Sequence, residues 1–578
     1  MKKKLLVLLF AATVAFCSVI AASAASPDVL TEGDWQYIIT ADQTARVVGC
    51  TTSQPVNVTV PGTLGGRTVT AVGNPGDRQR VFQDFSTIAR VTLPESITEI
   101  GGHAFYACWK LASINIPAGL QSIGTSAFHD CNLLPNLTLP NTVTSLGEGA
   151  FTRCFGITEF VIPPRVTAIP ANLFASSGLA KITIPSGVRS IGDSAFNNTP
   201  LKEITFPDSV TEIGGDIFRQ CHSLEKAVLP AGLTKISDHM FVACANLKRL
   251  DIPGTVKTIE ASAFWLCSAL ENLVLPEGLQ SIELDAFHGC SALKNITIPS
   301  KVTSIGPYAF QSCTGLQSIV LPAGLTTIGF KAFFGCSALK SIAFPAGLQA
   351  IYDETFAGCT SLKEVTIPGN VKKICDYAFA NCSSLTSATL NEGVESLCWS
   401  AFLDCPSPRI NVPRSVKEIP TLGRGKYEIP ANYPKTMTIF GYRDSAAHQF
   451  AYEAYYDPWH GGYPVYNVVP FVDLETGEQN PLPTLKITCS QEPLGYGGGA
   501  TLTASLRDVT WSGGNKYVKL LTPDGRTVAV ASQRNFIKTG SATITATSGT
   551  QQAAYTVKVK PSTLDWLRII FLFGWIWM

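Results

Sequence analysis

The sequence predicts a solenoid of about 15 coils of 22–23 residues, followed by a small all-β sandwich. Three observations predict this fold class. Phenylalanine recurs every 23 residues, with two intervals of 22, at positions 82, 105, 128, 151, 174, 196, 218, 241, 264, 287, 310, 333, 356, 379 and 402. Around these positions the frame L-x-x-I-x-I-P-x-x-V-x-x-I-G-x-x-A-F-x-x-C returns, for example over residues 293–313. Further on, between residues 485 and 560, Thr- and Val-rich segments alternate with Gly-bearing turns.

The frame specifies the elements of one coil in order. The L-x-x-I-x-I segment alternates apolar and polar residues, which predicts a short strand with one buried face. Proline ends this strand because it has no N–H to continue the ladder. V-x-x-I-G supplies a second apolar pair and a corner glycine, and A-F begins a short helical or 3-10 turn with the Phe ring at the centre of the coil. One coil cannot bury these side chains alone, so the coils must stack, about 4.8 Å apart.

The repeat frame resembles the BspA-like leucine-rich repeat family of bacterial surface and secreted proteins, from residue 28 to about 457. Residues 33–37 (GDWQY) look like the family's N-terminal cap, and residues 438–451 look like its C-terminal cap, where the repeat gives way to a helix. We therefore expect a cap over 26–80, leucine-rich repeats over 81–413 and a second cap over 414–457. Caps are physically required, since a bare end coil exposes apolar surface and strand edges. The resemblance implies adhesion to host proteins, extracellular matrix or other cells.

Residues 485–560 resemble a group 2 bacterial immunoglobulin-like domain. The resemblance rests on the alternating runs at 500–504 (ATLTA), 541–547 (SATITAT) and 554–559 (AYTVKV), together with Trp511. Such modules are usually stalks on surface proteins. The Pro- and Gly-bearing stretch 458–484 is expected to be the linker between the two parts.

Both ends of the chain indicate export. Residues 1–25 are typical of a signal peptide: three lysines, an apolar run and small residues before the cleavage site. The apolar run is short for a membrane anchor, and the bulky Phe16 before Cys17 argues against lipoprotein processing. Residues 561–578 form a hydrophobic aromatic tail in which Trp566, Trp575 and Trp577 suit a membrane interface. The alternative is a last strand or helix that docks on the preceding domain. We expect the protein at the bacterial cell surface or outside the cell.

The composition excludes several classes of function. The 578 residues include 44 Lys and Arg against 43 Asp and Glu, a net charge of +1, whereas a nucleic-acid binder carries a basic face or excess. Metalloprotease, nucleophile-elbow, phosphate-loop and EF-hand motifs are absent from the sequence. We therefore expect no enzyme and no cofactor, with a hydrolase as a remote alternative, and a monomeric chain.

Seventeen cysteines first suggest a disulfide framework. Twelve of them, however, lie three residues after a repeat Phe and fall into runs of three and nine, both odd numbers that cannot pair completely. A small buried thiol that closes each turn is the simpler interpretation. The two short coils, at Phe174 and Phe196, lack this cysteine. Cys375 and Cys398 instead occupy the corner-glycine position one coil apart, and they are the candidate disulfide. No metal-site spacing is present.

Two surfaces are candidates for ligand binding. Alternate residues of each strand share the solvent face, and there the sequence places Thr183, Thr205, Asp251, Thr297 and Thr366. This mixed-charge, Thr-rich face offers many polar contacts, although β-branched residues also simply suit an exposed strand. The second surface is the coil edge beside Ala-Phe, which carries Trp265, His288, Tyr308, Phe334, Tyr377 and Trp399.

Exposed aromatic side chains act as interface anchors and stack on sugar rings; the alternative is packing over the neighbouring turn. Trp265, His288 and Tyr308 lie in consecutive coils and are the first residues to mutate. We expect an adhesin-like binding protein for a host protein, matrix or glycan. The alternative is a non-adhesive envelope scaffold that binds the polysaccharide of its own cell wall.

Overall fold

The computed structural model describes most of the repeat region and a set of strands beyond it. The described residues are 28–52, 55–74, 81–82, 86–406, 408–419, 438–442, 445–447, 471–477, 479, 487–490, 499–504, 510–513, 518–524, 527–532, 540–548 and 551–559. The chain divides into unit 1 (Met1–Lys363 and Ile374–Ser384) and unit 2 (Glu364–Lys373 and Leu385–Met578), which are described separately.

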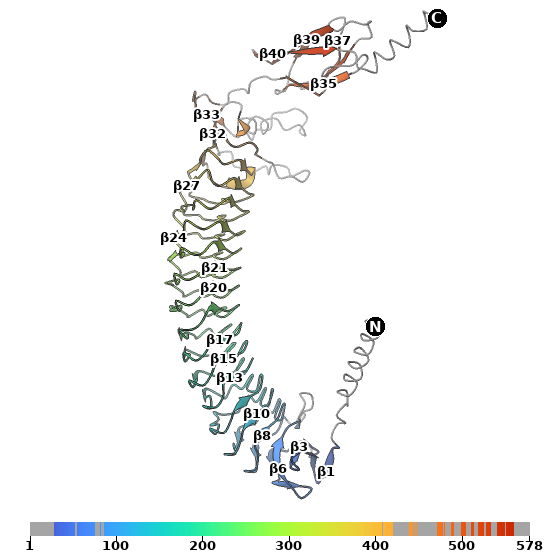
Figure 1. The fold of residues 1–578 in the computed structure, drawn as a ribbon, viewed down its shortest axis with the longest axis vertical. Coiled ribbons are helices and arrows are strands. Elements are labelled where there is room, and N and C mark those ends of the chain that lie inside the picture. Colours follow the sequence, from blue (N-terminus) through green and yellow to red (C-terminus); the bar gives the residue numbers. More distant parts are fainter. Residues whose placement is uncertain are drawn as a thin grey trace, which may run out of the picture. The chain divides into compact units, whose positions relative to one another are not determined.

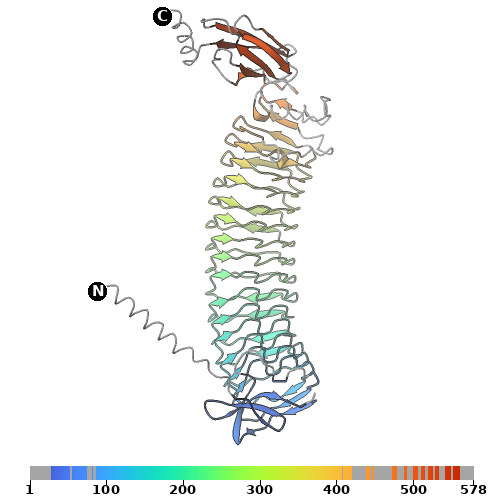
Figure 2. The same cartoon turned by 90° about the vertical axis from the view of Figure 1, so that its right-hand side faces the viewer.

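Unit 1 is a stack of flat coils that lie one above another (Figures 1 and 2), which confirms the predicted repeat solenoid. The L-x-x-I-x-I segment forms the first strand of a coil, and its residues pair in parallel with the equivalent residues of the next coil, as Glu203 does with Lys226. The first strands of unit 1 are β4 (Asn57–Thr59), β7 (Arg90–Thr92), β9 (Ser113–Ile114), β12 (Glu159–Val161), β14 (Lys181–Thr183), β16 (Glu203–Thr205), β18 (Lys226–Val228), β22 (Asn295–Thr297) and β24 (Ser318–Val320).

The V-x-x-I segment ends in a second, shorter strand. Its isoleucine is buried and its preceding polar residue is more exposed, as in the Thr258–Ile259 pair. In unit 1 these strands are β8 (Glu99–Ile100), β10 (Ser122–Ile123), β11 (Ser145–Leu146), β13 (Ala168–Ile169), β15 (Ser190–Ile191), β17 (Glu212–Ile213), β19 (Lys235–Ile236), β20 (Thr258–Ile259), β21 (Ser281–Ile282), β23 (Ser304–Ile305), β25 (Thr327–Ile328) and β26 (Ala350–Ile351); β28 (Lys373–Ile374) lies at the boundary of the units.

An N-terminal hairpin region covers the first coil. Three antiparallel strands lead into β6, which pairs in parallel with β8 of the first coils. The Trp35 ring packs edge-on against the Phe82 ring at 6.3 Å, so the end of the phenylalanine column is shielded. The strands of this region are β1 (Leu30–Glu32), β2 (Trp35–Ile39), β3 (Ala45–Cys50), β5 (Thr63–Leu64) and β6 (Arg67–Val72).

The turn that carries each phenylalanine differs from the expected short helix. In the coils from Phe105 to Phe379, the residues two positions before and two positions after the Phe have positive φ, as at Tyr308 (57°) and Ser312 (57°). A positive φ at the third residue of a turn gives type II geometry, which cannot continue into a helix. The N–H groups of Tyr308, Phe310 and Ser312 instead donate to carbonyls of the next coil at 2.7–2.9 Å. Hydrogen bonds between coils therefore hold the turn open. Within the described residues the only 3-10 helix is η1 (Trp399–Phe402), in unit 2.

The repeat phenylalanines form a continuous buried column. From Phe82 to Phe379 consecutive rings stack with centroid distances of 5.1–6.3 Å, and the widest separations, 6.3 and 6.0 Å, flank Phe196 in the short coils. The rings fill the centre of each coil, as the frame predicts, and offset stacking adds to their burial.

The cysteine column lies beside the phenylalanines and acts through hydrogen bonds. In ten coils the thiol donates to the backbone carbonyl of the Phe in the preceding coil, with S···O distances of 3.0–3.4 Å. In the short coils Ser177 and Thr199 occupy the same position and are equally buried; the Thr199 hydroxyl donates to the Phe196 carbonyl at 2.8 Å. The position therefore requires a small side chain with a hydrogen-bond donor.

Unit 2 continues the repeat and then departs from it. Its parallel sheet runs β27–β29–β31–β32–β33. Helical backbone begins at Ala446 and Ala447, and the rest of the expected cap helix lies outside the described residues. Strand β33 falls within 458–484, the stretch expected as a linker, where it pairs with β32. The strands are β27 (Glu364–Ile367), β29 (Ser387–Leu390), β30 (Ser396–Leu397), β31 (Arg409–Asn411), β32 (Thr438–Gly441) and β33 (Phe471–Asp473).

Beyond β33 the described residues of unit 2 form two antiparallel sheets. One has the order β34–β35–β38–β37 and the other β36–β39–β40. Leu502, Val528 and Ile544 are fully buried in them. The strands are β34 (Ile487–Cys489), β35 (Gly499–Ala504), β36 (Thr510–Gly513), β37 (Val518–Asp524), β38 (Thr527–Ser532), β39 (Gly540–Ser548) and β40 (Gln551–Val559).

The expected signal peptide, residues 1–25, and the aromatic tail with Trp566, Trp575 and Trp577 lie outside the described residues. In the part of the chain that is described, no helix has the length and apolar character needed to cross a membrane.

Candidate binding surfaces

The first candidate surface is the strand face, the exposed side of the first strands. Thr183, Thr205, Asp251 and Thr297 are all exposed on it, and the residue between the two outward positions is less exposed: Ile296 is buried between Asn295 and Thr297, and Ile182 is half-buried before Thr183. Thr366 of unit 2 is likewise exposed beside the buried Val365. The strand face therefore places these five residues in solvent as predicted. Their role in binding stays a prediction.

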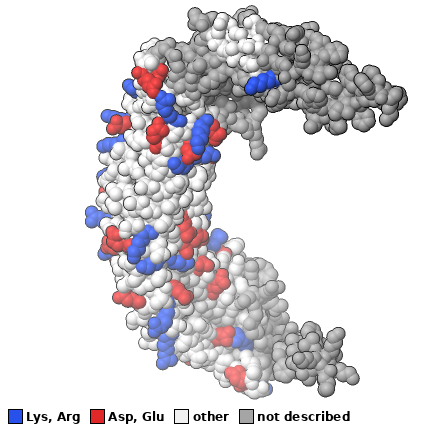
Figure 3. All heavy atoms as spheres, turned by 45° about the horizontal axis from the view of Figure 1, so that its top comes forward, with Lys and Arg blue, Asp and Glu red and all other residues white. Residues whose placement is uncertain are grey.

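The strand face has a mixed character. Glu159 and Lys181 face each other across β12 and β14, with 3.9 Å between carboxylate and ammonium, and both are largely exposed. Valines interrupt the threonines, and Val274 is 83% exposed. Exposed acidic and basic residues alternate along the first strands, as in Glu159, Lys181, Glu203 and Lys226, so the strand face has no field of a single sign. Figure 3 likewise shows both signs of charge on the visible side of the coils. An exposed pair of this kind contributes little stability, and the polar groups stay available to a partner.

The second candidate surface is the turn edge, formed by the side chains two to three positions before and one after each repeat Phe. Trp265 and His288 lie on consecutive coils with ring centroids 6.0 Å apart. His288 Nδ1 is 2.8 Å from Asp285 Oδ1, which fixes the orientation of the imidazole. Both rings are half-buried. The structure thus brings together two of the predicted residues and adds Asp285.

The next two coils extend this group. The Tyr308 ring packs edge-on against Phe330 at 5.2 Å. The Lys331 ammonium lies 5.0 Å from the Phe330 centroid and 5.3 Å from the Phe334 centroid, and 3.2 Å from the Glu354 carboxylate. The sequence did not single out Phe330 and Lys331 as candidates. The feature that could have indicated them is their position in the turn, three and two residues before Phe333. We name Trp265, Asp285, His288, Tyr308, Phe330, Lys331 and Phe334 the turn-edge cluster.

Two polar atoms in this region are buried without a hydrogen bond to any described residue. They are Trp265 Nε1 and Gln311 Oε1, and Gln311 occupies the same turn position as Trp265, His288 and Phe334. A buried polar group without a partner costs about 1–3 kcal/mol. A bound molecule that reached these atoms would recover part of that cost.

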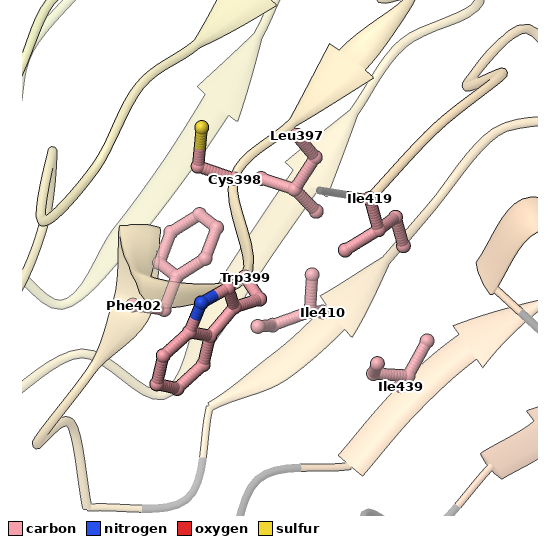
Figure 4. A pocket seen from close by; sticks show the side chains of 7 residues that line it. All are labelled: Leu397, Cys398, Trp399, Phe402, Ile410, Ile419 and Ile439. Carbon is pink, nitrogen blue, oxygen red and sulfur yellow. The ribbon is translucent and has the colours of Figure 1, made fainter. Parts of the chain in front are cut away.

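Tyr377 and Trp399 do not join the cluster. Tyr377 is half-buried in unit 1. Trp399 belongs to unit 2, where its indole packs near Phe402 and Ile410 at the edge of a small apolar pocket (Figure 4). Leu397, Cys398, Ile419 and Ile439 complete the lining. The environment of Trp399 therefore fits packing over a neighbouring turn, the alternative that the sequence left open.

The cysteines of the repeat are poor nucleophiles. Burial raises the pKa of the thiols of Cys108, Cys313 and Cys359 to about 12 and that of Cys221 to about 11. The thiolate is the reactive form, and these thiols stay protonated at neutral pH. Cys375 and Cys398 are both buried, and their pairing as a disulfide stays a prediction. Within the described residues no group of three His, Cys, Asp or Glu side chains could hold a metal ion.

Several solved structures are similar to this chain. No curated protein matches the chain. Among solved structures, it is similar to a leucine-rich repeat protein from Bacteroides ovatus (28% identity, 71% of this chain and 94% of that chain, TM-score 0.48). It is also similar to a leucine-rich cell surface protein from Faecalibacterium prausnitzii (30%, 64% and 96%, 0.44) and to the pneumococcal vaccine antigen PcpA (19%, 73% and 95%, 0.33).

A family model described as "BspA type Leucine rich repeat region (6 copies)" matches residues 78–202, 189–317 and 303–422. These ranges cover more than half of the chain and include every repeat phenylalanine from Phe82 to Phe402. The chain therefore belongs to the BspA-type leucine-rich repeat family.

Proposed function

We propose that this chain is an exported, adhesin-like binding protein that holds a host protein, matrix or glycan partner on its solenoid. The observation that carries the proposal is the turn-edge cluster. It presents half-exposed aromatic faces on coils that follow one another, from Trp265 to Phe334. A catalytic group would need one reactive side chain in a shaped site, whereas this cluster repeats similar contacts along the stack.

The chemistry of the cluster suits a ligand with both apolar and polar groups. The rings of Trp265, Tyr308 and Phe334 offer faces for stacking. His288, oriented by Asp285, and the buried atoms Trp265 Nε1 and Gln311 Oε1 offer hydrogen bonds. Aromatic anchors surrounded by polar groups are typical of interface hot spots.

The strand face supports the same function as a broader, weaker contact area. Its outward residues Thr183, Thr205, Asp251, Thr297 and Thr366 are exposed. Polar contacts of this kind fix the orientation of a partner more than they add affinity.

The rest of the chain fits display outside the cell. Residues 1–25 read as a signal peptide, and the two antiparallel sheets between β34 and β40 support the proposal that this part of the chain is an immunoglobulin-like stalk. The aromatic tail supplies a membrane-interface contact in this proposal. In this proposal the function is binding, and the repeat thiols do not serve as nucleophiles because burial raises their pKa values.

The test is a binding screen of the purified full chain on arrays of matrix proteins and glycans and on cell-wall polysaccharide. We expect a ligand whose affinity falls at least about tenfold in Trp265→Ala and in Phe334→Ala. Tyr106→Ala is the matched control, because Tyr106 has the same turn position as Trp265 and stacks on His129 seven coils nearer the N-terminus. Equal losses in all three variants, or no binding on any array, would contradict the proposal. Binding to wall polysaccharide alone would favour the envelope-scaffold alternative.

A further inference from the structure

Between the turn edge and the strand face lies a corner formed by the fourth and fifth residues after each repeat Phe. In three consecutive coils one of these two positions holds a large apolar residue, which the repeat does not have there. Trp109, Leu133 and Phe155 are 52%, 57% and 52% exposed there. The 23-residue coils from Phe218 onward hold small or polar residues at the same two positions. Up to the coil of Phe379 these pairs are His222-Ser223, Ala245-Asn246, Ser268-Ala269, Ser291-Ala292, Thr314-Gly315, Ser337-Ala338, Thr360-Ser361 and Ser383-Ser384. We name Trp109, Leu133 and Phe155 the corner patch.

The neighbouring column changes in the same coils. The position directly after the repeat leucine or isoleucine holds Ala112, Pro135 and Thr158 beside the corner patch. In the coils from Phe196 to Phe356 the same position holds Lys202, Glu225, Lys248, Glu271, Lys294, Gln317, Lys340 and Lys363, while Ala180 and Thr386 leave it uncharged in the coils on either side. The corner patch therefore lies in coils that lack the charged column, and its exposed apolar side chains have no charged residue at this neighbouring position. Packing of the coil does not require either change, because the other coils fold without them.

The backbone around the corner patch keeps these side chains uncovered. Pro135 has no N–H, and no strand forms at 135–139, so Ile114 and Ile116 of the preceding coil are half-buried rather than buried. On the other side, Gly178 packs against the Phe155 backbone: a Cβ there would lie within 2.8 Å of the Phe155 carbonyl carbon. The coil after Phe155 therefore places no side chain over it at this point. The apolar area exposed by the three side chains is on the order of 300 Å², comparable with the largest apolar patch of a typical monomeric protein, which is often functional.

We propose that the corner patch is a docking site for an amphipathic α-helix of a partner protein, with an acidic residue on the flank of its apolar face. The coils supply the spacing: the ring centroids of Phe105, Phe128 and Phe151 are 5.3 and 5.6 Å apart. A helix along the solenoid axis presents one side chain per turn, about every 5.4 Å. An extended strand presents one on the same side about every 6.7 Å and drifts out of register within the three coils.

Charge gives the partner its second property. Lys110 follows Trp109, is exposed, and has no ion pair among the described residues. Arg153, two residues before Phe155, is held by Asp130 at 2.8 Å, so its charge is largely compensated. The open cation at the border of the corner patch is therefore Lys110, which complements a carboxylate beside the helix's apolar stripe. The corner patch lies at least five coils from the turn-edge cluster, so this proposal goes beyond the proposed function and does not depend on it.

The test uses the full chain and a displayed library of 20-residue peptides. Half of the library places apolar residues at i, i+3, i+4 and i+7 with flanking glutamates, and half has the same composition in strict alternation. The variant combines Trp109→Ser, Leu133→Ala and Phe155→Ser, residues that other coils of this chain carry at these positions. Val274→Thr and Val320→Thr, which remove exposed apolar side chains elsewhere, form the control.

We expect enriched peptides to come from the helical half, to bind the triple variant at least about tenfold more weakly, and to bind the control unchanged. Lys110→Glu should also weaken binding of these peptides, and the loss of affinity should be larger in low salt than in high salt. A thermal melt equal to that of the wild type shows that the triple variant is folded. Enrichment of alternating peptides, or equal binding to the triple variant, would overturn the proposal. Two further results would overturn the proposal. If the wild type self-associates and the triple variant does not, the occupant of the corner patch is a second copy of this chain. If the wild type binds anionic vesicles and the triple variant does not, the occupant is a membrane.

Discussion

The phenylalanine column offers the most direct measure of what holds the solenoid together. Phe287 has no exposed surface, and its ring lies 5.2 Å from Phe264 and 5.1 Å from Phe310, nearly parallel to the former. Phe196 is equally buried, but its neighbours are 6.3 and 6.0 Å away, because the short coils widen the column. The same substitution at the two positions therefore removes the same burial and different stacking.

Phe287→Ala should lower the free energy of unfolding by about 4–5 kcal/mol, and Phe196→Ala by about 3–4 kcal/mol. Truncation of a buried Phe costs about 3–5 kcal/mol in general, and each close ring pair adds about 0.5–1.5 kcal/mol to its burial. Dispersion weakens steeply as rings separate, which gives Phe287 the larger loss.

Urea unfolding followed by circular dichroism measures the global change. Hydrogen exchange of the amides around each position measures the local opening of single coils, which is the more direct quantity in a solenoid. A loss below about 2 kcal/mol at Phe287, or a loss at Phe196 that equals or exceeds it, would refute the conclusion that stacking between coils stabilises the column.

Three further outcomes follow from the turns and the thiols. Burial raises the pKa of the Cys221 and Cys313 thiols above the ordinary thiol value, so the folded chain holds these protons more tightly than the unfolded chain does. Their contribution to the free energy of unfolding is therefore intact below about pH 9 and is lost as the pH rises toward 11–12. In urea titrations at successive pH values, the Cys221→Ala variant should lose less stability over this range than the wild type. Cys290→Ala should cost about 1–2 kcal/mol and Cys290→Ser less, since serine keeps the donor that reaches the Phe264 carbonyl at 3.2 Å; a larger loss in the serine variant would show that apolar packing outweighs the hydrogen bond. Gly335 has a φ of +71°, and a Cβ there would make only ordinary contacts with Ser312, the nearest at 3.8 Å, so Gly335→Ala should cost about 1 kcal/mol through the backbone. Gly119 has open space and no positive φ, so Gly119→Ala should be neutral or slightly stabilising in the same melts.

Much of the solenoid was predictable because residues at the same position of successive repeats have the same environment in the fold. The 23-residue period placed Phe287 and its equivalents in one buried column, and the two-residue period placed Thr297 and its equivalents in solvent. The odd runs of cysteines argued against complete pairing and for a thiol in each turn, and the hydrogen-bonded column agrees with that interpretation. These inferences needed only the position of a residue within its coil.

The candidate site was predictable only in part. Trp265 and His288 were expected on one edge because they follow the Phe in consecutive coils, and they are in ring contact. Phe330 and Lys331 were not expected, because their contacts with Tyr308 and Phe334 depend on how the turn projects each side chain toward the next coil. Trp399 lies three residues before Phe402 in unit 2, and its packing against the apolar pocket beside η1 was not signalled by that turn position.

The sequence by itself determined the number of coils, the columns that are buried and the columns that face solvent, because those properties follow from periodicity and hydrophobicity. Only the tertiary structure decided the conformation of the Phe turn. Residues as different as His103, Leu266, Tyr308 and Lys331 all adopt positive φ there, so residue type carries no signal for it. That conformation is set by the neighbouring coil, whose carbonyls accept the N–H groups of the turn, and by the thiol that donates back across the stack. A contact between coils exists only once they are stacked, and for that reason the expected helix gave way to a ladder of turns.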